Sequence, residues 1–313
     1  MFEKKSIKFD GEDAILITGL GPYNLADTME CGQCFRYERV NRPDGIVEFV
    51  TVSGNTLIRV AQEKTGELIF AGMSDEVFET VARPYFSLDL DLDEVRADIT
   101  SNTDSDWLKE AAEFASGIAI LKQDPWESLV SFIISQNNNI PRIKKIVREI
   151  CSHYGTNLTL KKDNNSCPIS LIEGKPCEKV CRECGRCYTF PSANDILRDP
   201  DGLLPSKPGF RYPYILDAAD AIANGRVDFS DISEHASYEY TVEKLKEIKG
   251  VGDKVASCVA LFGLSNLEAF PIDVWMKRAI DTYFNGSLDP TTLGKYAGVA
   301  QQYIFHYIRH TSK

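Results

Sequence analysis

The most informative stretch of the sequence is Leu245-Lys246-Glu247-Ile248-Lys249-Gly250-Val251-Gly252-Asp253-Lys254-Val255-Ala256. One helical pattern ends here, Gly250 and Gly252 turn the chain, and a second helical pattern begins and continues through Cys258. Glycine adopts backbone conformations closed to other residues and lets a bulky anion approach the main-chain amides. The stretch therefore predicts a helix-hairpin-helix that can hold a DNA phosphate. The alternative is a plain connection between two packed helices.

Two ionisable residues accompany the hairpin. Lys254 lies in the first turn of the second predicted helix, where the helix dipole disfavours an ammonium ion, and a neutral lysine amine can attack a sugar carbon and form a Schiff base. Asp273 follows 19 residues later, which is enough for one helix and a return loop. A carboxylate can stabilise the positive charge that develops on a sugar when a glycosidic bond breaks. Taken separately, the residues read as a solvated lysine and a helix N-cap, but together they predict a catalytic pair.

The N-terminal part of the chain has a different pattern. Short β-branched runs at Ala14–Ile17, Val47–Val52 and Leu57–Val60 are separated by turns, which is typical of an antiparallel sheet. From about residue 73 the hydrophobic period becomes helical, and Asp124-Pro125 and Pro141 mark two helix starts. We therefore expect an α+β fold, in which an antiparallel β-sheet domain precedes a mostly α-helical domain. The expected boundaries are 1–100 for the sheet domain and 101–313 for the helical domain, with a cysteine-rich insertion at about 165–188.

Charge and hydropathy limit the partners. The net charge is −11, but residues 74–110 hold 11 acidic and 3 basic side chains, whereas residues 141–189 hold 10 basic and 5 acidic ones. Acidic runs are usually solvated faces, so the overall charge is weak evidence against a nucleic-acid partner. No apolar run approaches the roughly 20 residues of a membrane span, and the N-terminus is polar. We expect an intracellular protein, of the cytoplasm or nucleoid, with no membrane partner.

The sequence resembles the helix-hairpin-helix DNA glycosylase superfamily, and within it the 8-oxoguanine DNA glycosylase/lyase branch. The resemblance covers nearly the whole chain and is strongest at residues 250–254 and at Pro271-Ile272-Asp273-Val274. It implies that Lys254 attacks the anomeric carbon with support from Asp273, and that the Schiff base then allows β-elimination of the 3′ phosphate. The implied partner is duplex DNA containing 8-oxoguanine, bound by a monomer that needs no cofactor for catalysis.

The resemblance also assigns recognition residues. Gly32, in Cys31-Gly32-Gln33-Cys34-Phe35-Arg36, would accept a hydrogen bond from N7–H of the oxidised base through its carbonyl, while Gln301 and Phe305 would read and stack on that base. Cys258 would cover the other face, although a small buried cysteine is the simpler interpretation. The residues implied to enter the site of the flipped nucleotide and read the orphaned cytosine are Asn137, Arg142, Phe210 and Arg211.

Two features depart from the family pattern. Trp275 replaces a histidine that helps to hold a phosphate in animal members, so that contact is in doubt. The second is a cysteine cluster, whose expected metal ligands are Cys177, Cys181, Cys184 and Cys187. Clustered thiols in an intracellular protein favour metal ligation over disulfides. Zinc is the first expectation and an iron-sulfur cluster the alternative, whereas Cys31, Cys34 and Cys151 are expected to be free.

Two other functions compete with this interpretation. A sister glycosylase acting on oxidised pyrimidines or alkylated purines would share the hairpin, but would lack the combination of Gly32, Gln301 and Phe305. A non-catalytic helix-hairpin-helix DNA-binding module would leave the pairing of Lys254 with Asp273 unexplained.

Overall fold

The computed structural model describes residues 2–158, 186–235 and 237–311. Its N-terminal part is a six-stranded antiparallel sheet in the order β1-β2-β6-β5-β4-β3. The strands are β1 (Glu3–Phe9), β2 (Glu12–Thr18), β3 (Tyr37–Val40), β4 (Val47–Ser53), β5 (Thr56–Gln62) and β6 (Leu68–Ala71). The three β-branched runs of the sequence fall in β2, β4 and β5, so the predicted sheet is confirmed.

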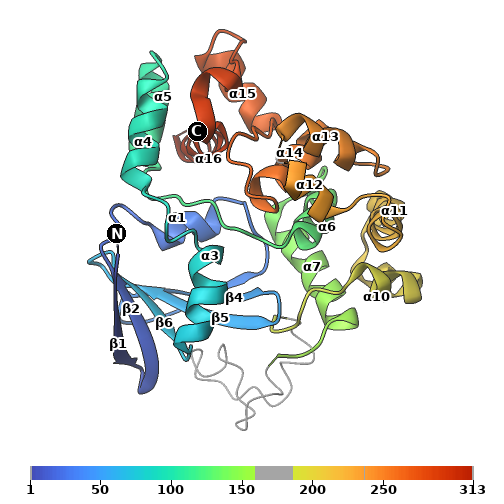
Figure 1. Cartoon of the computed structure of the whole chain (residues 1–313), viewed down its shortest axis with the longest axis horizontal. Helices are drawn as coiled ribbons and strands as arrows, with labels where there is room; N and C mark the ends of the chain where they lie inside the picture. The colour runs from blue at the N-terminus through green and yellow to red at the C-terminus, as the bar shows by residue number, and fades with distance from the viewer. Residues whose placement is uncertain (1, 159–185, 236, 312–313) are drawn as a thin grey trace.

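Apart from α1, which lies between β2 and β3, the helices follow the sheet, as the change of hydrophobic period predicts (Figure 1). Those up to residue 154 are α1 (Leu25–Glu30), α2 (Asp75–Val77), the π-helical η1 (Phe78–Ala82), α3 (Arg83–Tyr85), α4 (Leu92–Ser101), α5 (Asp106–Phe114), α6 (Pro125–Ser135) and α7 (Ile140–Tyr154). The later α-helices are α10 (Ala193–Arg198), α11 (Tyr212–Ala223), α12 (Phe229–His235), α13 (Tyr238–Lys246), α14 (Asp253–Phe262), α15 (Val274–Tyr283) and α16 (Ala297–Thr311). Short 3-10 helices are η3 (Pro200–Ser206), η4 (Gly209–Arg211) and η5 (Pro290–Tyr296).

Side-chain caps set several of these helix boundaries. The Asp124 carboxylate accepts from the amide of Glu127 and starts α6, and Asn139 caps α7 in the same way. Pro125 and Pro141 occupy the first turns, where a missing N–H costs nothing. Both helix starts predicted from the sequence are confirmed.

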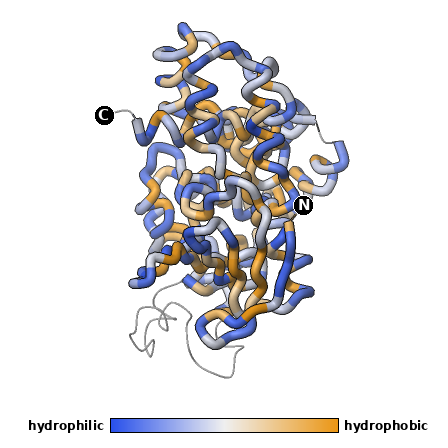
Figure 2. The backbone as a smooth tube through the Cα atoms, turned by 90° about the vertical axis from the view of Figure 1, so that its left-hand side faces the viewer, coloured by the Kyte–Doolittle hydropathy of each residue, from blue (hydrophilic) through white to orange (hydrophobic). Residues whose placement is uncertain are grey.

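Each part of the chain has its own buried core, and Figure 2 shows hydrophobic stretches running through both. Aromatic side chains such as Phe49, Phe70 and Phe86 fill the core on one face of the sheet. The larger core is built from the helices and contains residues of α6, α7, α14 and α16. No helix in the described part of the chain is long and apolar enough to cross a bilayer.

The extended segment between α5 and α6 ties the sheet to the helices. Ala119 and Leu121 belong to the core of the sheet, yet they lie just before α6. The buried Gln33 side chain donates to the Ala119 carbonyl (2.9 Å) and accepts from the Leu121 amide (2.8 Å). These bonds fix the chain around Gly32 relative to the helical part.

Candidate active site

The hairpin joins α13 to α14, as predicted. Gly250 has a φ of +84°, and a Cβ there would lie 2.3 Å from the ring of Tyr214, so this position requires glycine. Gly252 is the N-cap of α14, with no capping side chain and no atom within 4 Å of the place where its Cβ would stand. The first amides of α14 are therefore accessible to an approaching anion such as a phosphate.

Lys254 lies in the first turn of α14 and is half-buried. Its Nζ donates to the Ser135 hydroxyl at the end of α6 (3.0 Å) and lies 5.1 Å from the centre of the Phe132 ring. The Ser135 hydroxyl itself donates to the Phe132 carbonyl (2.8 Å), so its lone pairs face the lysine. Ser135 thus orients an N–H of the lysine nitrogen toward the end of α6. Nothing in the sequence pattern pointed to this contact, because the two residues are 119 positions apart.

This contact makes Ser135→Ala a test of amine positioning. We expect single-turnover Schiff-base formation to slow by about tenfold, the kinetic equivalent of one lost hydrogen bond. Ser152→Ala is the matched control. The Ser152 hydroxyl also donates to the carbonyl three residues back (3.0 Å to Glu149), but among the described residues it accepts no hydrogen bond from a lysine. Equal rates for the Ser135 variant and the wild type would show that the serine does not position Lys254.

Asp273 is the N-cap of α15 and accepts from the Met276 amide through Oδ1 (2.9 Å). Cys258 connects it with the lysine: burial raises the pKa of Cys258 to about 11, and the charges of Lys254 and Asp273 act on its thiol in opposite directions. The charges of the lysine and of the carboxylate therefore both act on this thiol, although the two residues belong to different helices. In the described part of the chain Asp273 forms no ion pair, so Oδ2 is available to a positively charged sugar.

The residues assigned to the damaged base come from the N-terminal part and from α16. Gly32 has a φ of +92°, and a Cβ there would lie 3.6 Å from the Phe305 ring, so the two residues meet. Phe305 is half-buried on α16, and Gln301 is buried one turn before it. Cys258 is buried on α14. Cys31, Cys34 and Cys151 are buried elsewhere in the fold, and the prediction that these three are free is confirmed.

The polar turn between α6 and α7 is held by Arg211. This arginine is 2% exposed, and its guanidinium donates to the main-chain carbonyls of Gln136, Asn137 and Pro208. Burial, and secondly the charge of Arg142, lower the pKa of Arg211. In this structure Arg211 therefore supports the loop that carries Asn137. These bonds use four of its five N–H groups, so one Nη1–H remains for its assigned contact with an orphaned cytosine.

Three assigned residues around this loop are exposed. Asn137 has a φ of +48°, Arg142 lies in the first turn of α7, and both are accessible to solvent. Phe210 is 51% exposed and packs edge-on against Tyr214. The Arg211 guanidinium lies 4.4 Å from the Phe210 ring centre, which links the aromatic side chain to the loop.

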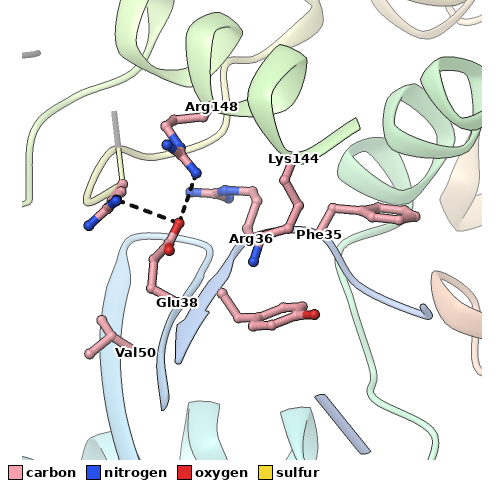
Figure 3. A pocket seen from close by; sticks show the side chains of 8 residues that line it. Phe35, Arg36, Glu38, Val50, Lys144 and Arg148 are labelled. Atoms are coloured by element: carbon pink, nitrogen blue, oxygen red, sulfur yellow. Dashed lines mark hydrogen bonds and ion pairs between the residues drawn. The ribbon is translucent and has the colours of Figure 1, made fainter. Parts of the chain in front are cut away.

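A small charged cleft lies between the sheet and α7, beside the segment that carries Gly32 (Figure 3). Glu38 pairs with Arg148 (3.0 Å), while Arg36 pairs with Glu127 (2.6 Å). The Lys144 ammonium lies 3.7 Å from the centre of the Tyr37 ring. The cavity has a volume of about 20 Å³ and accommodates no more than a water molecule. The ion pair between Glu38 of β3 and Arg148 of α7 joins the sheet to the helix.

Of the two departures from the family pattern, the structure describes Trp275 fully and the cysteine cluster only in part. Trp275 is 37% exposed beside Asp273, and the Arg278 guanidinium lies 5.9 Å from its ring centre. The expected metal ligands Cys177, Cys181 and Cys184 lie outside the described residues, and Cys187 is described and buried. The metal site stays a prediction.

The fold joins an N-terminal antiparallel sheet to a helical part with a glycine hairpin. Lys254 follows the hairpin directly, and the charges of Lys254 and Asp273 both act on Cys258. This arrangement is that of a helix-hairpin-helix DNA glycosylase. Residues 15–129 match the family described as "8-oxoguanine DNA glycosylase, N-terminal domain". The solved structure of MBOgg1 in complex with a low-affinity DNA ligand is 30% identical, covers 99% of this chain and 100% of that one, and has a TM-score of 0.81. The chain belongs to the 8-oxoguanine DNA glycosylase family.

Two further relatives agree with this membership. The Clostridium acetobutylicum 8-oxoguanine glycosylase/lyase, solved with double-stranded DNA containing cytosine opposite 8-oxoguanine, is 28% identical with a TM-score of 0.80, covering 100% of this chain and 99% of that one. An N-glycosylase/DNA lyase of Saccharomyces cerevisiae is 28% identical over 273 residues, or 81% of this chain. The match spans 66% of the yeast protein's length.

Proposed function

We propose that this enzyme excises 8-oxoguanine from duplex DNA, preferably opposite cytosine, and then cleaves the strand at the resulting site. Its class, a DNA N-glycosylase with DNA lyase activity, follows from the family. The observation that carries the proposal is the Lys254 amine, held by Ser135 (3.0 Å) beside Cys258, a thiol on which the charge of Asp273 also acts. A plain connection between helices would need neither the amine nor the carboxylate.

The chemistry begins when the Lys254 nitrogen donates its lone pair to C1′ of the flipped nucleotide. The C1′–N9 bond breaks, its electron pair leaves with the base, and Asp273 stabilises the positive charge on the sugar. As the sugar ring opens to a Schiff base, one proton of the lysine nitrogen passes to the ring oxygen O4′ and the other to the departed base. Loss of a C2′ proton then expels the 3′ phosphate and breaks the strand.

Base selection rests on the meeting of Gly32 and Phe305. The Gly32 carbonyl would accept a hydrogen bond from N7–H, a proton that 8-oxoguanine has and guanine lacks. Phe305 would stack on one face of the base and Cys258 on the other, with Gln301 at the Watson-Crick edge. The 3.6 Å between a Cβ at Gly32 and the Phe305 ring supports a pocket with both residues in its wall.

The loop at the end of α6 would fill the gap left by the flipped nucleotide and contact the orphaned base of the opposite strand. Asn137 would fill the gap left by the flipped nucleotide, and the exposed Phe210 ring would wedge into the unstacked step, which repays part of the stacking energy. Arg142 is the accessible guanidinium, so we propose that it reads the orphaned cytosine. Arg211 would act with it by supporting the loop, and by a direct bond from the Nη1–H that its four carbonyl bonds leave unused.

The Arg142 role predicts a change in selectivity. Arg142→Met should lower the preference for cytosine by about tenfold or more, because a well-placed arginine contact contributes about 1–3 kcal/mol of base discrimination. The measurement is the excision rate opposite each of the four bases at fixed salt. Lys145→Met is the control, since it removes an exposed charge from the same helix (71% exposed) and should slow all four duplexes alike. An unchanged preference in the Arg142 variant would contradict the assignment.

A panel of lesions tests the function itself. We expect rapid strand cleavage at 8-oxoguanine and little at an oxidised pyrimidine or an alkylated purine in the same sequence. A faster reaction on either of the latter would favour the sister glycosylase. Binding without any cleavage would favour the DNA-binding module.

We further propose that a structural zinc ion is held by Cys177, Cys181, Cys184 and Cys187, and that the enzyme acts as an intracellular monomer. Metal analysis of protein purified without added metal should find about one zinc per chain, as a four-thiolate site requires. Cys181→Ser should lose it. Iron with acid-labile sulfide would favour the iron-sulfur alternative, and a metal-free protein would contradict both.

A further inference from the structure

Arg309 lies on α16, one turn after Phe305, and is half-buried. In the parts of the chain that the structure describes, its guanidinium forms no ion pair and no hydrogen bond. The half-buried Arg36 and the buried Arg211 both have acceptors: Glu127 pairs with Arg36, and three main-chain carbonyls accept from Arg211. A guanidinium taken out of water without an acceptor loses free energy, so its ligand is expected to arrive from outside.

The position of Arg309 indicates where that ligand binds. Its guanidinium carbon lies 5.2 Å from the centre of the Phe305 ring. Its Nη1 lies 3.9 Å from the place where a Cβ on Gly32 would stand. The cation therefore borders the two residues that are proposed to line the base pocket.

We propose that Arg309 donates a hydrogen bond to the O8 carbonyl of the flipped base and stabilises the negative charge that the base acquires on leaving. This inference rests on the proposed function. If N7–H of the base donates to the Gly32 carbonyl, O8 is on the adjacent ring atom, so a donor next to Gly32 meets O8. When the C1′–N9 bond breaks, its electron pair stays on the base and spreads from N9 through C8 to O8, until a proton neutralises it.

A guanidinium beside O8 is therefore worth more in the transition state than in the bound substrate. The competing ligand is a DNA phosphate, which is the commonest partner of an arginine in a DNA-binding protein. The contacts favour the base, because Arg309 lies against Phe305 and Gly32, whereas it is not among the atoms within 4 Å of the Cβ position at the hairpin glycine, Gly252.

The test separates the two ligands by using DNA with and without the base. Arg309→Met should slow single-turnover excision of 8-oxoguanine opposite cytosine by about 10- to 100-fold, as expected for the loss of one charged hydrogen bond. The same variant should cleave a preformed abasic site opposite cytosine at the wild-type rate, because that substrate has no base to contact. Wild-type abasic cleavage also shows that the variant is folded. Arg309→Lys should excise 8-oxoguanine at a rate between those of the wild type and Arg309→Met.

Arg198→Met serves as the control for charge removal, because the Arg198 side chain is 76% exposed on α10 and pairs with Asp195 alone in the described part of the chain. Equal losses by Arg309→Met on both substrates would assign Arg309 to a phosphate and overturn the proposal, as would no loss on either. If the wild-type enzyme itself left 8-oxoguanine in place while cleaving abasic sites, the proposed function would fail, and that result is distinct from either outcome for Arg309.

Discussion

Lys254→Gln is expected to abolish strand cleavage and to lower base excision by at least about 10³-fold, because the variant has no amine to form the covalent intermediate. Glutamine keeps a donor for the Ser135 hydroxyl, which now accepts from the lysine at 3.0 Å. The hairpin glycines are untouched, so affinity for a duplex containing 8-oxoguanine should be close to that of the wild type. The measurements are single-turnover cleavage and equilibrium binding on the same duplex.

The matched control is Lys246→Gln, which removes the same charge from the end of α13. Lys246 is 45% exposed and pairs with Asp253 at 2.6 Å, so its loss should weaken binding slightly and leave cleavage intact. Substantial strand cleavage by the Lys254 variant would mean that another amine is the nucleophile, and the account of the site would be wrong.

Asp273→Asn is expected to slow base release by about 10²- to 10³-fold, since the amide cannot stabilise the positive charge on the sugar. Asparagine caps helices as well as aspartate does, so α15 and the free energy of unfolding should change little. Single-turnover excision and chemical denaturation of the same preparation distinguish the two effects.

Asp124→Asn provides the comparison for Asp273, because Asp124 caps α6 with the same kind of bond (2.8 Å to the Glu127 amide). This control should excise at the wild-type rate. If Asp273→Asn also kept the wild-type rate, the carboxylate would be no more than a helix cap.

Sequence reasoning succeeded where the signal is local. The hairpin glycines, the caps at Asp124 and Asp273 and the change from a two-residue to a helical period each depend on neighbours in the chain, and all appear in the structure. The family resemblance added the residues of the base pocket, which no local pattern could bring together. Gly32 and Phe305 are far apart in sequence and meet only because the Gly32 segment is anchored to the helical part.

Contacts between distant segments were not predictable. The Ser135 hydroxyl meets Lys254 across 119 residues, and Arg211 is buried because two loops meet at its guanidinium. Arg309 belongs to no sequence motif. In the described structure its guanidinium has no acceptor, and it lies beside Gly32. The charge of a residue can be read from sequence, but its partners depend on the tertiary fold.

The central claim is that the Lys254 nitrogen bonds covalently to the sugar of the damaged nucleotide. The most direct measurement is borohydride reduction of the wild-type enzyme during its reaction with a duplex containing one 8-oxoguanine opposite cytosine, followed by peptide mass spectrometry of the trapped complex. We predict a single cross-link, on Lys254. A cross-link on another amine, or strand cleavage that leaves no cross-link at all, would contradict the account.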